Sequence, residues 1–229
     1  MIVKKIQNQH GLRAEEVPQL MLTHGVEYQK VACVNWPKEF PYAPKMEVAL
    51  AHTGDSLLLH YRVDENCIRA AAEADGGRVW EDSCCEIFLQ PSSPITHHPT
   101  PYFNIECNCA GTLLIGKGED RHDRQPATAA TLQLANRWSS LMKTAVSGEN
   151  GRYTIPLKDG KFTWHMALVV PATALFDSGI TDFSGQTLRG NIYKCGDCLT
   201  TPHFLSLFPI DTPQPDFHRP EFFGELTFE

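Results

Sequence analysis

The residues with the clearest chemical potential are an indole and a carboxylate between positions 79 and 91. Trp80 lies in an expected loop, and Glu86 follows six residues later on an expected strand. Alternate side chains of a strand point to opposite faces. The apolar, core-facing set is Cys85, Ile87 and Leu89. The opposite face carries Cys84, Glu86, Phe88 and Gln90.

A flat apolar ring beside a fixed acceptor is what a protein needs to hold a sugar. The indole of Trp80 would cover the C–H face of a pyranose, and the carboxylate of Glu86 would accept hydroxyl protons. A Trp and a Glu at this spacing also occur often by chance. The pair therefore favours saccharide binding and needs support from other residues.

Polar side chains gather on the non-core faces of four expected strands. These faces carry His60 and Arg62; Glu86 and Gln90; Asn104, Glu106 and Asn108; and Arg189, Asn191 and Tyr193. If the four strands share one sheet, the faces form one patch with the donors and acceptors that sugar hydroxyls need. Outward strand faces are often only solvated, but asparagine is depleted in strands and gains little there without a partner. We therefore expect a collective binding patch.

Two alternative functions would use other chemistry. Glu86 and Glu106 could be the carboxylate pair of a glycoside-cleaving enzyme, if their separation is suitable and one of them has a raised pKa. A haem or redox domain would need axial ligands inside the fold. Met142 and Met166 are the candidates for that role, although the apolar neighbours of Met166 favour core packing.

The cysteines give a weaker signal for a metal. There are eight, at positions 33, 67, 84, 85, 107, 109, 195 and 198. We expect them to be reduced and mostly buried. Cys195 and Cys198 have CxxC spacing, with Cys107, Cys109 and His203 as conceivable partners, but a structural zinc site normally shows two clean pairs. We expect no cofactor, and the sequence has no compact run of Asp or Asn ligands that would place a calcium ion.

The elements that must position these residues are short strands. Period-two alternation indicates strands at Leu57–Val63, Tyr102–Cys109, Thr112–Gly116, Leu141–Val146, Phe162–Val170, Leu188–Tyr193 and Phe222–Phe228. Helical turns are expected near Glu65–Ala74 and Pro171–Phe176, and residues 119–136 are ambiguous between loop and helix. The chain of 229 residues is therefore predicted to be all-β. It should form an antiparallel β-sandwich with long loops, as one domain over residues 1–229.

Charge and hydropathy exclude some partners. The formal net charge is −7 and no basic run is present, which argues against nucleic acid and anionic membranes. No apolar stretch is long enough to span a bilayer. The segment Met1–Leu22 lacks the apolar core of a signal peptide. A cytoplasmic location is expected, although a trimmed secreted or periplasmic protein would look the same.

Several segments together resemble the bacterial carbohydrate-binding module family nine-like proteins. They are Val34–Trp36, Trp80–Pro91, Tyr102–Thr112, Arg189–Asp197, Pro202–Ser206 and Pro215–Leu226. The resemblance implies a β-sandwich related to DOMON domains that binds sugar chain ends without catalysis. A separately encoded glycoside hydrolase is a conceivable partner, and calcium occurs in some members.

The family's better-understood members hold the sugar between two Trp rings, with polar side chains on the hydroxyls. By position, Trp80 resembles the first ring and Glu86 the neighbouring acceptor, with Asn191 or Arg189 as polar contacts. Where a second Trp is expected, this chain has Leu207 between Phe204 and Phe208. The predicted ligand-binding residues are Trp80, Glu86, Arg62, Asn104, Asn108, Arg189, Asn191, Phe204 and Phe208.

Overall fold

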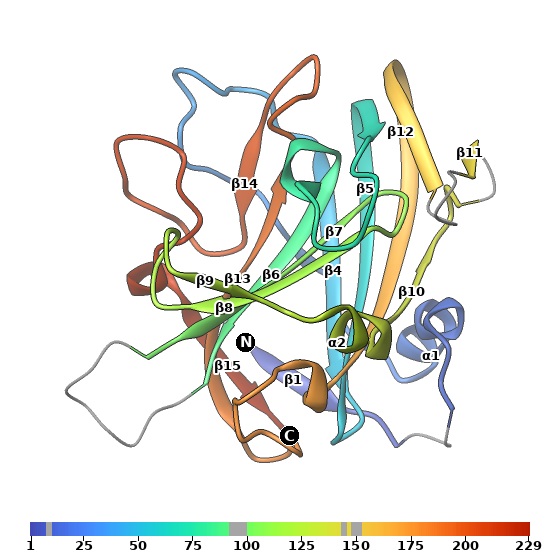
Figure 1. Ribbon diagram of the computed structural model, residues 1–229, viewed down its shortest axis with the longest axis vertical. Coiled ribbons are helices and arrows are strands. Elements are labelled where there is room, and N and C mark those ends of the chain that lie inside the picture. Colours follow the sequence, from blue (N-terminus) through green and yellow to red (C-terminus); the bar gives the residue numbers. More distant parts are fainter. Residues whose placement is uncertain (8–10, 92–99, 143–145, 148–152) are drawn as a thin grey trace.

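The computed structural model describes residues 1–7, 11–91, 100–142, 146–147 and 153–229. Within them, fifteen strands form one hydrogen-bonded sheet that folds into two layers (Figure 1). The short β1 (Ile2–Lys5) joins the layers, because it pairs in parallel with β15 (Gly224–Phe228) and with β4 (Lys45–His52). The predicted all-β sandwich is confirmed.

The first sheet runs in the order β15-β13-β6-β7-β8-β9, with β14 beside β13 and β3 beside β14, and these pairings are antiparallel. Its further strands are β3 (Cys33–Val34), β6 (Cys84–Gln90), β7 (Tyr102–Asn108), β8 (Leu113–Gly118), β9 (Arg124–Pro126), β13 (Thr187–Cys195) and β14 (Phe204–Ser206). Because β6 lies between β13 and β7, the residues of three long strands are in register at the middle of this sheet.

The second sheet contains the two longest strands, β5 (Ser56–Ala70) and β12 (Tyr153–Pro171), which pair with each other. Its further strands are β2 (Gln29–Lys30), β4 and β10 (Asn136–Ser139), with β11 (Val146–Ser147) paired to β12. The helices are α1 (Val17–Thr23), α2 (Ala129–Leu134) and four 3-10 turns at Ala14–Glu16, Val79–Glu81, Ala172–Ala174 and Pro220–Phe222. α1 packs on the outer face of the second sheet, where Val17 and Met21 join a cluster with residues of β4, β5 and β12. Among the helices of the described residues, none is long and apolar enough to cross a membrane.

The main core lies between the sheets and follows the alternation seen in the sequence. Cys85, Ile87 and Leu89 of β6 are fully buried and share one cluster with alternate residues of β5 and β7. The other face of the first sheet is buried as well. Side chains of this face and of the loops over it form an outer cluster, which consists of Trp36, Val79, Cys84, Phe88, Tyr102, Tyr193, Cys195, Ile210, Phe217 and Phe223. Glu86 and its neighbours therefore point away from the main core, but not into open solvent.

Some predicted elements differ from the structure. The helical turn predicted near Glu65–Ala74 is wrong, because β5 continues to Ala70 through pairing with β12 and residues 71–74 are not helical. The turn at Pro171–Phe176 is confirmed by a 3-10 helix, and the ambiguous region contains α2. β12 pairs with β10, whereas the predicted partner Leu141–Val146 lies partly outside the described residues. The short α1 was not predicted.

The expectation that four polar faces share one sheet is also wrong in part. β6, β7 and β13 are neighbours in the first sheet, so their polar residues do meet. His60 and Arg62 belong to β5 in the second sheet. Their face is covered by Tyr28, whose ring lies 3.6 Å from the Arg62 guanidinium carbon. The sequence could not show this, because alternation says which face a residue takes but not which sheet holds the strand.

Candidate functional site

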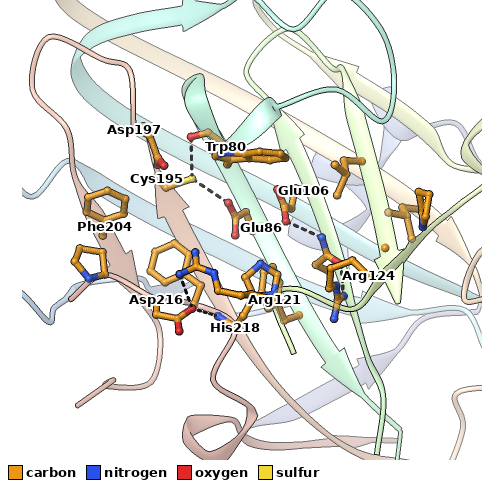
Figure 2. A pocket seen from close by; sticks show the side chains of 18 residues that line it. Trp80, Glu86, Glu106, Arg121, Arg124, Cys195, Asp197, Phe204, Asp216 and His218 are labelled. Atoms are coloured by element: carbon orange, nitrogen blue, oxygen red, sulfur yellow. Dashed lines mark hydrogen bonds and ion pairs between the residues drawn. The ribbon is translucent and has the colours of Figure 1, made fainter. Parts of the chain in front are cut away.

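A cavity of about 480 Å³ opens on the outer face of the first sheet, at β6, β7 and the end of β13. Its floor includes Glu86, Asn104, Glu106 and Cys195. Trp80 lies over one side of the two glutamates, while Arg121 and His218 lie on the other side (Figure 2). The sheet supplies the polar floor, and loops that are distant in sequence supply the walls.

Trp80 is held by backbone contacts at the end of β13. It belongs to the 3-10 turn Val79–Glu81, and Val79 anchors that turn in the outer cluster. The carbonyl of Trp80 accepts hydrogen bonds from Asp197 N at 3.2 Å and from Cys195 Sγ at 3.6 Å. The indole itself is half-buried and lines the cavity. A fixed backbone therefore presents this ring to the cavity.

Two buried carboxyl groups face each other across neighbouring strands. Glu86 of β6 is directly opposite Glu106 of β7, and both are almost fully buried. Cys195 Sγ donates to Glu86 Oε1 at 2.9 Å, and Asn104 Nδ2 donates to Glu106 Oε1 at 2.7 Å. Glu106 Oε2 has no hydrogen-bond partner among the residues that the structure describes. A ligand hydroxyl could satisfy this oxygen.

Burial controls the protonation of this pair. Burial, followed by repulsion from Glu106, raises the pKa of Glu86 well above its usual range. Burial also raises the pKa of Glu106 to about 7, against the opposing hydrogen bond from Asn104. Protonation of one of the two carboxyl groups would let the pair donate one hydrogen bond while its other oxygens accept. Sugar hydroxyls need this combination of donor and acceptor.

Arg124 of β9 positions the amide next to this pair. Its guanidinium donates to Asn104 Oδ1 and to the carbonyl of Tyr102, and it lies 4.3 Å from the centre of the Tyr102 ring. With its oxygen engaged, Asn104 directs its Nδ2 to Glu106. The sequence interpretation missed Arg124, because it lies in a stretch without clear periodicity. Apart from its charge, Arg124 has no feature in the sequence that marks it as a residue of the site.

The far wall is aromatic. Phe204 lines the cavity and packs edge-on against Phe40, with ring centres 4.8 Å apart, and against Trp36 at 6.3 Å. Beside it, His218 Nδ1 is 2.8 Å from the Tyr102 hydroxyl. Burial, and then the nearby arginines, lower the pKa of His218 to about 3, so this ring is neutral at physiological pH.

Of the nine predicted ligand-binding residues, four line the cavity: Trp80, Glu86, Asn104 and Phe204. The structure does not bring the other five to it. Two are asparagines engaged with backbone. Asn108 accepts from Ala110 N and Thr112 N and donates to Asp82, whereas Asn191 accepts from Phe208 N and donates to Phe208 O.

The remaining three also have structural contacts. Arg189 donates to the carbonyls of Glu221 and Phe223 at 3.3 and 3.0 Å. Phe208 packs against the main core, close to Gly224. Arg62 lies in the second sheet, as described above. Strand alternation had suggested Arg62, Asn108, Arg189 and Asn191, and the family resemblance had suggested Phe208. In the structure, tertiary hydrogen bonds and packing engage the side chains of all five.

The metal and haem candidates also have clear positions. Cys195 is buried while Cys198 is exposed. Met166 is fully buried in the main core, where it packs with other apolar side chains. Within the described part of the chain, one group of three metal-ligating side chains has its donor atoms within 4.8 Å of one another: Cys84, Glu86 and Cys195.

The fold and the cavity define a ligand-binding β-sandwich module with an aromatic and carboxylic site on one sheet. The model of carbohydrate-binding family 9 matches residues 15–228, and the chain belongs to that family. No curated protein matches the chain.

Solved structures agree with this fold. A protein from Bacteroides uniformis ATCC 8492, described as carbohydrate-binding, is 41% identical with a TM-score of 0.90, over 100% of this chain and 98% of that chain. A family 9 module from Caldicellulosiruptor kristjanssonii in complex with glucose has 11% identity and a TM-score of 0.58, over 100% and 95% of the two chains. The same organism's family 9 module in complex with cellotriose has 12% identity and a TM-score of 0.60, over 100% and 94%.

Proposed function

We propose that this protein binds a mono- or oligosaccharide end, without catalysis, in the cavity beside Trp80. The observation that carries the proposal is the half-buried indole next to a buried carboxyl pair with one unsatisfied oxygen. Family membership supports it, and so do the glucose and cellotriose bound to the Caldicellulosiruptor modules of the same fold. The cavity volume is within the range of about 300–1,000 Å³ that is usual for small-ligand sites.

Each part of the site has a separate task in this proposal. Trp80 covers the apolar face of one sugar ring. Glu86 and Glu106 exchange hydrogen bonds with its hydroxyls, and Asn104 holds Glu106 in place. A hydroxyl on Glu106 Oε2 would remove the cost of a buried acceptor without a partner.

Family membership favours binding over cleavage, because the chain belongs to carbohydrate-binding family 9. We therefore expect no release of nitrophenol from aryl glycosides. Release that disappears in Glu86→Gln would instead establish the glycosidase alternative.

Isothermal titration calorimetry with glucose, cellotriose and a panel of other saccharides tests the binding. We expect Trp80→Ala to weaken binding of the best ligand by about 1–3 kcal/mol, because the stacking surface is lost. Tyr153→Ala is the matched control, since Tyr153 is an exposed aromatic residue on β12 outside the cavity. Its affinity should equal that of the native protein.

Two results would contradict the proposal. One is the absence of binding heat for every saccharide with the folded native protein. The other is an equal loss of affinity in Trp80→Ala and Tyr153→Ala, which would place the ligand elsewhere.

A further inference from the structure

Two thiols and a carboxyl group converge under the cavity. Cys84 and Glu86 are two residues apart on β6, so their side chains leave the same face of the strand. Cys195 of β13 is directly opposite Cys84 in the strand register. The donor atoms of all three lie within 4.8 Å of one another, and all three residues are buried. Figure 2 shows Cys195 and Glu86 pointing toward each other.

The thiols make their shorter contacts within this group. Cys84 Sγ donates to the carbonyl of Cys85 at 3.8 Å, and its thiol also interacts with the thiol of Cys195. Cys195 Sγ has two acceptors for its one proton, Trp80 O at 3.6 Å and Glu86 Oε1 at 2.9 Å. The two thiols can therefore rotate slightly without breaking a short hydrogen bond to a residue outside this group.

The donor set indicates the kind of metal. Thiolates exclude calcium and magnesium, which take oxygen ligands. Two sulfurs and one carboxylate oxygen suit zinc, at about 2.3 Å and about 2.0 Å from the ion. Around one tetrahedral ion, donor atoms at these bond lengths lie slightly less than about 4 Å from one another. The three donor atoms now lie within 4.8 Å of one another, so they need to approach by only about one ångström.

We propose that Cys84, Glu86 and Cys195 form a Zn²⁺ site at the floor of the cavity. Glu86 and Cys195 line the cavity, which gives the ion an entry path and leaves the fourth coordination position to a group from the cavity. Glu106 lies opposite Glu86, and its oxygen without a described partner could take this position when no saccharide hydroxyl occupies it. Binding releases the two thiol protons to solvent, together with the proton of Glu86 where that carboxyl is protonated. The exposed Cys198 has no part in the site, so the CxxC spacing is incidental.

Cobalt is the probe for this site, because a Co²⁺ ion on thiolates gives sulfur-to-metal charge-transfer bands in the near ultraviolet. The full chain is treated with chelator, kept under a non-thiol reductant so that the facing cysteines stay reduced, and titrated with Co²⁺ and then Zn²⁺. We expect the bands to saturate at one equivalent and to disappear as Zn²⁺ displaces Co²⁺. The affinity should rise with pH, because the ligating thiols must lose their protons.

The variants Cys84→Ser and Cys195→Ser should lose the bands, and Glu86→Gln should weaken Zn²⁺ binding by more than about tenfold, since even the loss of an outer-shell partner costs that much. Cys198→Ser is the matched control and should keep the native spectrum. Zn²⁺ should also raise the unfolding midpoint of the native protein and of Cys198→Ser equally, a readout that does not depend on the folding of the other variants.

The proposal is overturned if the reduced native protein gives no charge-transfer band. It is also overturned if the band persists in Cys195→Ser or is lost in Cys198→Ser. Saccharide titrations of the chelator-treated protein are independent of these outcomes. Failure of the zinc site therefore leaves the proposed saccharide function to its own test.

Discussion

At the scale of single residues, the site depends on buried polar groups that hold each other in place. Arg124 orients Asn104, and Asn104 orients Glu106. Such a chain is stable only while each member keeps its partner, because a buried polar atom without one costs free energy. The rigidity of the cavity floor therefore depends on an arginine outside the floor.

Arg124→Met tests this dependence. Removing the guanidinium leaves Asn104 Oδ1 without its donor, so we expect the free energy of unfolding to fall by about 1–3 kcal/mol. Saccharide affinity should fall by roughly tenfold, since an unrestrained Asn104 no longer holds Glu106. Urea denaturation and calorimetry measure the two effects. Arg13→Met, at an exposed arginine far from the cavity, should change neither, and an unchanged affinity in Arg124→Met would show that Asn104 does not need this support.

Strand faces could be predicted from the sequence, and the cover over them could not. Alternation along β6 and β7 correctly separated the core residues from Glu86 and Asn104. Whether an outward face is solvated depends on loops from other parts of the chain. Phe217 and Ile210 lie over β13 and β6, and no local pattern shows that contact. For the same reason Asn191 looked like a ligand contact, although it bonds the backbone of Phe208, seventeen residues away.

At the scale of elements, the outer face of the second sheet holds a pair of histidines, of which His60 is buried and His165 half-buried. His60 Nε2 is 3.3 Å from His165 Nδ1, and His60 Nδ1 is 2.5 Å from the Tyr28 hydroxyl. Burial, followed by repulsion from His165 and Arg62, lowers the pKa of His60 to about 3. The folded protein therefore keeps this ring neutral.

This gives a pH dependence of stability with a defined sign. In the unfolded chain His60 takes up a proton below about pH 6.5, whereas the folded chain resists protonation down to about pH 3. The stability that depends on the neutral ring is therefore lost as pH falls below 6.5, by at most about 1.4 kcal/mol per pH unit. Urea denaturation between pH 7 and 5 should show a steeper loss for the native protein than for His60→Gln. His24→Gln, at an exposed histidine, should keep the native slope, and equal slopes in native protein and His60→Gln would contradict the prediction.

At the scale of the whole molecule, an ion pair crosses the main core and connects the two sheets. Lys194 of β13 is fully buried, and its Nζ lies 2.9 Å from Glu65 Oε2 of β5. Trp164 Nε1 donates to the other carboxylate oxygen at 2.7 Å, and His203 Nε2 is 2.9 Å from the ammonium group. Each charge has been removed from water, so each depends on its partner.

A double-mutant cycle tests this connection. Lys194→Met should destabilise the fold by about 3–5 kcal/mol, because Glu65 is left buried without its counter-charge. Adding Glu65→Leu should recover much of that loss, since an apolar pair of similar size needs no solvation. Lys45→Met removes an exposed pair with Asp64 at 3.9 Å and should change the free energy of unfolding by about 1 kcal/mol or less. Additive effects of the two core substitutions, measured by denaturant unfolding, would contradict the coupling.

The joining role of β1 also determines how the polypeptide could be rearranged. The amino group of Met1 donates to Glu225 O at 2.7 Å, and Glu229 N donates to Val3 O at 3.1 Å. The two ends therefore lie on neighbouring strands (Figure 1). A short glycine-rich link between them would close the backbone into a ring, and the chain could then be reopened at an exposed turn. A fusion partner attached at either end would start from the same pair of strands, so the choice of end would hardly alter its distance from the cavity.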